Sequence, residues 1–244
     1  VAEGVVDAYR QAMGLWSFFG VENINVVWTL MSENDYEWWR ERVLSIEGDN
    51  PALDVWDPEP NLMGHCYLQP SSFCGYGNAQ SVPGTMFQYN VIGSEYRGGT
   101  RSQTVIHEAV HFYQTAVTDN LRDVTPCWFE EGQASLIGMA ASGDPGGLSY
   151  GVKHELNRFG KRLPGDPTWS VDRWKAEFDG YIADRQTRDA CMESGAGYTT
   201  GAVAFEDLYM NYSMWDIHEV TLRAVETGSW EQAVEDVLGI TSGE

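Results

Sequence analysis

The sequence has few basic residues, and lysine is especially rare in it. Its 244 residues include 15 lysines and arginines against 36 aspartates and glutamates, a formal net charge of −21. Its only lysines are Lys153, Lys161 and Lys175. A surface this anionic repels phosphate groups, so we expect no nucleic-acid partner and no docking to acidic membranes. The charge fits cationic partners or salty surroundings, although a merely soluble acidic surface explains it equally well.

Long apolar runs and paired cysteine motifs are also missing. No run approaches the ~18–20 apolar residues of a membrane-spanning helix, so we expect no membrane span. Cys66, Cys74, Cys127 and Cys191 form no C-x-x-C pair, which argues against a structural zinc knuckle. The even count favours two disulfides over four buried free thiols. Three pairings are possible, and we expect Cys66–Cys74, which are eight residues apart, together with Cys127–Cys191. With the acidic composition and a first residue that is not methionine, this predicts a secreted or cell-surface protein.

The order of strand-like and helical segments predicts an α+β fold in one domain, residues 1–244. Residues 1–100 are expected to form a lobe with a small mixed sheet and helices, and residues 101–244 a mainly helical lobe. Apolar periodicity predicts helices in the first twenty residues and over 35–46, and strands over Asn25–Met31 and Thr85–Ile92. Helix starts are predicted by Thr125 as an N-cap before Pro126 at the first helical position, and by a capping box of Ser229 and Gln232.

The most informative segment is Thr104–Gln114, TVIHEAVHFYQ, which contains H-E-x-x-H as His107, Glu108 and His111. On a helix, residues four apart lie one above the other, so both imidazoles can bind one metal ion with Glu108 beside it. The motif arises by chance in such a chain only about 0.01 times. The alternative is an amphipathic helix with two incidental histidines.

The residues around the motif predict a helix that is buried on nearly all sides. Two apolar stripes comprise Val105, Ala109, Phe112 and Ala116, and Ile106, Val110, Tyr113 and Val117. A narrow polar stripe comprises His107, His111, Gln114 and Thr118. Because unpaired buried polar groups are costly, this polar stripe needs a partner.

A third ligand is available downstream, in the segment Trp128–Ala134, WFEEGQA. A carboxylate on a second helix can complete a His, His, Glu zinc site whose fourth position stays open for catalysis. Glu130 and Glu131 are both candidates, and either could instead be an acidic first turn that complements the helix dipole.

The motif followed by W-x-x-E-G-x-A resembles the gluzincin metallopeptidases, the family of thermolysin-like catalytic domains. This resemblance implies a zincin-like fold, a bound Zn²⁺ and hydrolysis of peptide bonds. It implies that Glu131 is the third zinc ligand and that Glu108 activates a zinc-bound water. Tyr198, in the segment YTTGA, resembles the family's aminopeptidase tyrosine, which stabilises the oxyanion. Thermolysin has a supporting aspartate where this chain has Ser135, so the ligands must be supported differently here.

The surroundings of Tyr198 favour the same role. Thr199 or Thr200 can cap the apolar helix that follows, and Gly201 and Ala202 let that helix pack closely against a neighbour. Tyr198 is then expected at the mouth of this helix, where a phenol can donate to a developing oxyanion. His218 is the competing candidate for that role.

The favoured function is that of a zinc endopeptidase acting on peptides or proteins. We expect the substrate to pair as an added strand within residues 75–90. An aminopeptidase of the same fold is one alternative; it would need a carboxylate for the free amine, and Glu130 is the obvious donor. A zinc-containing binding or adhesion module without turnover is the other, and the presence of Glu108 argues against it.

Overall fold

The computed structural model describes the helices and strands of the chain together with short connecting segments. The described residues are 2–17, 25–47, 70–71, 73–79, 85–97, 102–117, 124–142 and 196–241, with 170, 172, 173 and 176. The chain divides into two compact units, Val1–Ala116 and Val117–Glu244. The sequence placed the boundary between lobes at residue 100, and the structure instead includes the H-E-x-x-H segment in the first unit.

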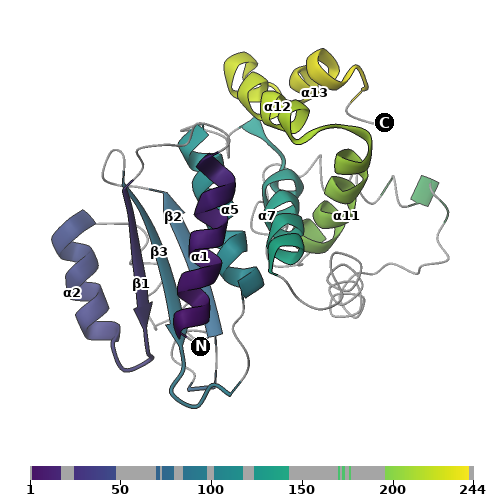
Figure 1. Cartoon of the computed structure of the whole chain (residues 1–244). Coiled ribbons are helices and arrows are strands. Elements are labelled where there is room, and N and C mark those ends of the chain that lie inside the picture. Colours follow the sequence, from purple (N-terminus) through teal and green to yellow (C-terminus); the bar gives the residue numbers. More distant parts are fainter. Residues whose placement is uncertain are drawn as a thin grey trace. The chain divides into compact units, whose positions relative to one another are not determined.

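The first unit combines a small sheet with helices (Figure 1). Its elements are α1 (Ala2–Trp16), β1 (Asn25–Met31), α2 (Tyr36–Glu47), β2 (Phe73–Ala79), β3 (Thr85–Ile92) and α5 (Ser102–Val117), the last residue of α5 falling just past the boundary. The predicted strands β1 and β3 and the predicted helices α1 and α2 are therefore confirmed. This unit and the helices of the second are compatible with an α+β fold.

The sheet is mixed, with the strand order β1-β3-β2. β1 pairs with β3 in parallel and β2 pairs with β3 antiparallel. The central strand is therefore β3, and β2 lies at an edge of the described sheet. The interval 75–90, in which we expected the substrate-binding edge, covers most of this edge strand and the first residues of the central one.

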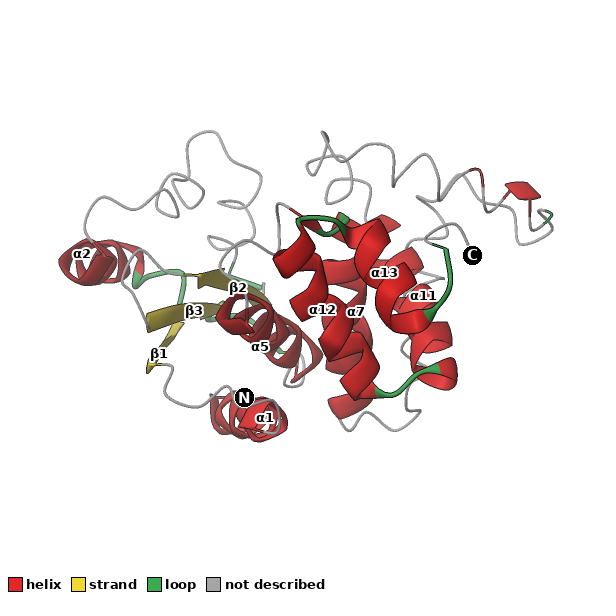
Figure 2. Cartoon of the chain, turned by 90° about the horizontal axis from the view of Figure 1, so that it is seen from above, coloured by secondary structure: helices red, strands yellow, loops and turns green. Residues whose placement is uncertain are grey.

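Both faces of the sheet are covered by helices (Figure 2). On one face, the side-chain amide of Gln88 in β3 donates to the carbonyl of Val105 in α5 at 3.2 Å. Tyr9 of α1 stacks on Trp28 of β1, which is the register partner of Gln88, so α1 and α5 share this face. α2 lies on the opposite face. The contact from Gln88 ties the helix that carries the H-E-x-x-H motif to the central strand.

The second unit contains four described helices, α7 (Cys127–Ala141), α11 (Ala196–Asn211), α12 (Met214–Thr227) and α13 (Trp230–Leu238). Their apolar faces form a common core, which includes Phe129, Leu136, Met139, Ala202, Phe205, Ile217, Val220, Ala224, Trp230, Ala233 and Val234. Aromatic rings form its centre, with 4.7 Å between the centroids of Phe129 and Phe205 and 4.3 Å between those of Phe129 and Trp230. The second half of the chain is helical where it is described, as predicted.

Helix ends in this unit are fixed by side chains and by left-handed glycines. Ser229 caps α13 by accepting from the backbone N–H of Gln232, as predicted, but the predicted capping box is not completed, because the N–H of Ser229 donates to the hydroxyl of Thr227. Ser213 and Asp216 form a reciprocal capping box at α12, which the sequence analysis did not identify. Gly228 and Gly239 have φ angles of 68° and 70° and end these two helices.

Two of the predicted helix starts are wrong in detail. Pro126, with φ −69° and ψ 147°, is itself the N-cap residue of α7, so Thr125 lies before the cap and its hydroxyl binds a glutamate instead. α11 begins at Ala196, which places Thr199 and Thr200 inside the helix rather than at its cap.

The close packing predicted for Gly201 is confirmed, and its partner is Gly132 of α7. A β-carbon added to Gly132 would lie 2.3–2.5 Å from backbone atoms of Gly201. One added to Gly201 would lie 2.3 Å from the carbonyl oxygen of Trp128 and 2.7 Å from the Cα of Gly132. Because these contacts are with backbone rather than with flexible side chains, α7 and α11 can keep this crossing only with glycine at both positions.

Gly201→Ala should therefore destabilise the second unit by about 1–3 kcal/mol or more, since overpacking forces the two helices apart. Gly14→Ala is the matched control: Gly14 is exposed in α1, nothing lies within 4 Å of its added β-carbon, and alanine favours the helix. Denaturant unfolding should show the loss for Gly201→Ala and no loss for Gly14→Ala. Equal stability of the two variants would mean that the helices do not cross this closely.

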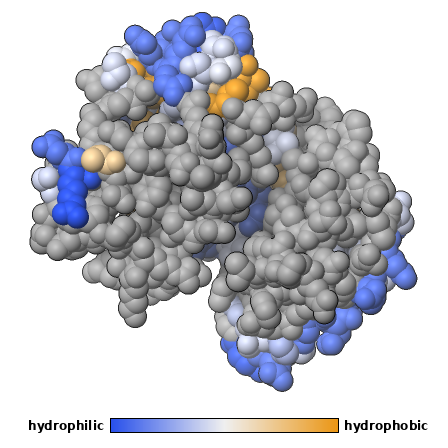
Figure 3. Space-filling model, turned by 180° about the vertical axis from the view of Figure 1, so that it is seen from behind, coloured by the Kyte–Doolittle hydropathy of each residue, from blue (hydrophilic) through white to orange (hydrophobic). Residues whose placement is uncertain are grey.

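The described surface carries both polar and large apolar side chains, among them Trp38, Met210 and Trp215. In the face that Figure 3 shows, the described side chains are mostly hydrophilic, with a small apolar area beside them. Among the described helices, none is both long and apolar enough to cross a membrane.

Candidate metal centre

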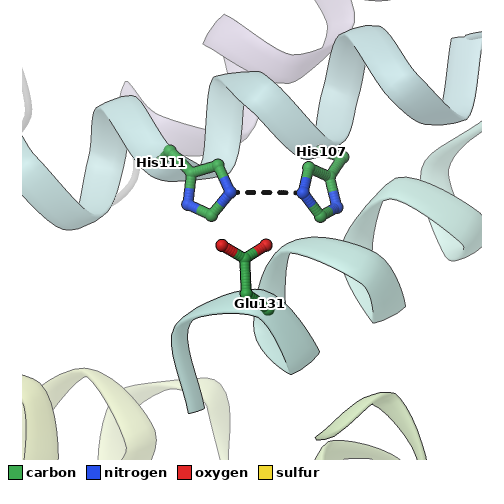
Figure 4. Close-up of side chains that lie close together, drawn as sticks. All are labelled: His107, His111 and Glu131. Carbon is green, nitrogen blue, oxygen red and sulfur yellow. Dashed lines mark hydrogen bonds between the residues drawn. The ribbon is translucent and has the colours of Figure 1, made fainter. Parts of the chain in front are cut away.

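The centre begins with two histidines one turn apart on α5. His107 and His111 are 9% and 8% exposed, and their rings lie edge to face with centroids 4.9 Å apart. The two Nε2 atoms approach to 3.2 Å (Figure 4). The side chains on either side of them along the helix, among them Val105, Ile106, Ala109 and Val110, are completely buried, as the apolar stripes predicted.

The carboxylate of Glu131 completes the group. One ligand atom each from His107, His111 and Glu131 lies within 4.8 Å of the other two, and all three side chains are buried. Figure 4 shows the Glu131 carboxylate pointing toward the two imidazole rings. This group can hold a metal ion.

The neighbouring glutamate is engaged differently. Glu130 is 1% exposed, and its Oε1 accepts a hydrogen bond from the hydroxyl of Thr125 at 3.0 Å. Among the described residues, it is Glu131 and not Glu130 that joins the histidines. The resemblance implied this choice, which the residues alone had left open.

His111 has one polar contact at its ring and another at its backbone carbonyl. Its Nδ1 lies 2.7 Å from Oε1 of Gln114, which is 3% exposed. The hydroxyl of Thr115 donates to the backbone carbonyl of His111 at 2.8 Å. Gln114 was predicted only as a member of the polar stripe, and its spacing of three residues from His111 was the signal that could have indicated this contact.

Glu108 and Tyr198 are both half-buried, and neither belongs to the metal-binding group. Glu108 directly follows His107 and so lies beside the ligand face of α5 rather than on it. Tyr198 is the third residue of α11, one turn before Gly201, and therefore lies on the side of α11 that packs against α7. Tyr198 was expected just before this helix, and it lies instead inside its first turn, near the start of the packed segment.

Other candidates have different environments. Burial lowers the pKa of His218, and the nearby Glu219 carboxylate partly opposes this shift. The rings of His218 and Trp215 lie edge to face, with their centroids 6.1 Å apart. His218 is not in the metal-binding group. His154 lies outside the described residues.

A further contact links the two helices that cross at the glycines. The side-chain amide of Gln133 in α7 donates to the hydroxyl of Tyr209 in α11 at 3.2 Å. Burial raises the pKa of Tyr209 to about 12, although this hydrogen bond acts in the opposite direction. Tyr209 is therefore a neutral phenol that helps to fix α7, the helix of Glu131.

Only one of the four cysteines can be compared with the predicted disulfides. Cys127, the first residue of α7, is disulfide-bonded. The side chains of Cys66, Cys74 and Cys191 lie outside the described residues, so the pairings Cys66–Cys74 and Cys127–Cys191 stay predictions.

The donor set fits a transition-metal ion, and zinc is among the ions that such a set binds. Two imidazole nitrogens and one carboxylate are the ligands of catalytic zinc sites, whereas calcium and magnesium prefer oxygen ligands throughout. Two Zn–N bonds of about 2.0–2.1 Å at a tetrahedral angle place their nitrogens about 3.3 Å apart. The observed separation of 3.2 Å between the two Nε2 atoms matches that spacing.

Comparison of the chain with protein-family models, with curated proteins and with solved structures found no match.

Proposed function

We propose that the chain is a zinc-dependent endopeptidase of the gluzincin type with a zincin-like catalytic domain. The observation that carries the proposal is the buried group of His107, His111 and Glu131, with Glu108 beside it. Three protein ligands leave one coordination position open, which is typical of catalytic rather than structural zinc. Bound zinc would polarise the scissile carbonyl and lower the pKa of a coordinated water toward about 7.

Glu108 has the position and chemistry of the general base. It directly follows the ligand His107 without belonging to the ligand group, and a carboxylate at this place can accept a proton from the attacking water. The same carboxyl group then donates that proton to the leaving nitrogen. A module that only bound zinc would not need a carboxylate at this position.

Tyr198 is proposed as the donor to the oxyanion. A phenol carries no charge in the ground state and donates a hydrogen bond where negative charge develops. The close packing of Gly201 on α7 fixes the turn that precedes it, and so fixes the segment from which Tyr198 extends. A rigid donor of this kind loses little energy to reorganisation during the reaction.

The substrate is proposed to bind as an extended strand along β2. This strand lies at an edge of the described sheet, and an edge strand can receive a peptide as an added strand. The net charge of −21 favours basic or neutral peptides over acidic ones, if the cleft shares the overall field.

The described contacts favour cleavage within chains over removal of N-terminal residues. In the aminopeptidase alternative, Glu130 would bind a free amine. Its carboxylate is instead buried and accepts from Thr125, so it is already committed within the protein.

The test combines a zinc assay with digestion of an unbiased peptide mixture. We expect about one zinc per chain and internal cleavages that are insensitive to blocked N-termini. Cleavage confined to free N-termini would replace the endopeptidase by an aminopeptidase. Bound zinc without any cleavage would leave a binding module, and absence of zinc would remove the proposal altogether.

A further inference from the structure

The contact between His111 and Gln114 determines which nitrogen of the imidazole carries the proton. The Nδ1 of His111 lies 2.7 Å from the amide oxygen Oε1 of Gln114. An amide oxygen has lone pairs and no hydrogen, so it can only accept. The proton of a neutral His111 ring must therefore be on Nδ1, and Nε2 keeps its lone pair.

That lone pair lies on the side of the ring where a metal ion would be held. The Nε2 of His111 is the atom that approaches the Nε2 of His107 to 3.2 Å. A histidine can bind a metal only through a nitrogen that carries no proton. The hydrogen bond from Nδ1 thus prepares His111 for coordination before any metal arrives.

We propose that Gln114 is a positioning residue for the metal centre, which holds His111 in the Nδ1–H tautomer and fixes the orientation of its ring. The inference rests on the proposed zinc site and names the residue that supports its second ligand.

The placement of Gln114 supports this role over a purely structural one. It is 3% exposed on a helix whose other faces are filled by apolar side chains, so an apolar residue would pack here at no polar cost. A buried amide at this point is favourable only if its hydrogen bonds are made, and the bond to His111 is one of them. Substitution of a residue that hydrogen-bonds to a metal-binding histidine typically lowers metal affinity by about 10–100-fold.

Two substitutions separate the hydrogen bond from the volume of the side chain. Gln114→Met keeps the length of the side chain and removes the acceptor, so zinc affinity should fall by about 10–100-fold. Gln114→Glu keeps an acceptor at the same distance and should retain affinity near that of the wild type. Thr221→Val is the matched control: it removes a buried hydrogen-bonding group of nearly the same volume in α12, which donates to the carbonyl of Ile217, and should change affinity little.

The measurements are competition of zinc with a chelator and ¹⁵N NMR of the His111 ring in metal-free full-length protein. The metal-free wild type should show the Nδ1–H tautomer, and Gln114→Met should shift the ring toward Nε2–H. A wild-type ring protonated at Nε2, or a Gln114→Met variant that keeps both tautomer and zinc affinity, would overturn the inference. A wild type that binds no zinc would count against the zinc site, whereas the tautomer would still decide the role of Gln114.

Discussion

Glu108→Gln should leave zinc bound and lower turnover by about 10²–10⁴-fold, the usual contribution of a general base. The amide has nearly the volume of the carboxylate, so the buried helix α5 should keep its packing. Because Glu108 lies outside the group of His107, His111 and Glu131, its charge is not needed to hold the metal. Steady-state kinetics on a peptide, together with elemental analysis of the same preparation, measures both properties.

The two readouts assign the cause of any loss. Turnover that falls while zinc stays at the wild-type level identifies Glu108 as the base. Activity within a few-fold of the wild type would remove it from that role. Loss of the metal together with the activity would show instead that Glu108 takes part in binding the ion.

Tyr198→Phe has the second largest expected effect. Removal of one hydrogen-bond donor to an oxyanion costs about 2.7–4 kcal/mol, or roughly 100–1000-fold in rate. Phenylalanine keeps the ring that is half-buried in the first turn of α11, so thermal stability and zinc content should change little. Turnover and unfolding temperature, measured together, distinguish a lost donor from a loosened helix.

His218→Ala is the comparison for that experiment. If activity survives Tyr198→Phe while His218→Ala abolishes it, the oxyanion role belongs to His218. Burial lowers the pKa of His218, which favours a neutral ring at neutral pH, and a neutral imidazole can still donate one hydrogen bond.

Elements with strong local periodicity were predictable from the sequence. β1 and β3 were predicted with the bounds that they have, since both are apolar, β-prone runs between turn residues. The burial of α5 followed from apolar residues on almost every side of the helix. β2 was not predicted as a separate strand, because its glycines Gly75 and Gly77 are poor strand formers, and its pairing with β3 supplies the stability that its own residues lack.

Details that depend on tertiary contacts could not be read from the sequence. Thr125 is of a residue type that is common at helix N-caps, yet its hydroxyl donates to Glu130, five residues further along the chain. The spacing of Glu130 and Glu131 allowed either one to approach the histidines, and the choice depends on how α7 is rotated about its axis. The crossing at Gly132 and Gly201 contributes to that rotation, and only the second member of this pair was recognised beforehand.

The central claim, that His107, His111 and Glu131 bind one zinc ion, is tested most directly by elemental analysis of two neighbouring variants. Protein purified without added metal should contain about one zinc per chain in the wild type. Glu130→Gln should keep that zinc, because Glu130 is bound to Thr125, whereas Glu131→Gln should lose most of it. Full zinc occupancy in Glu131→Gln, combined with its loss in Glu130→Gln, would contradict the account.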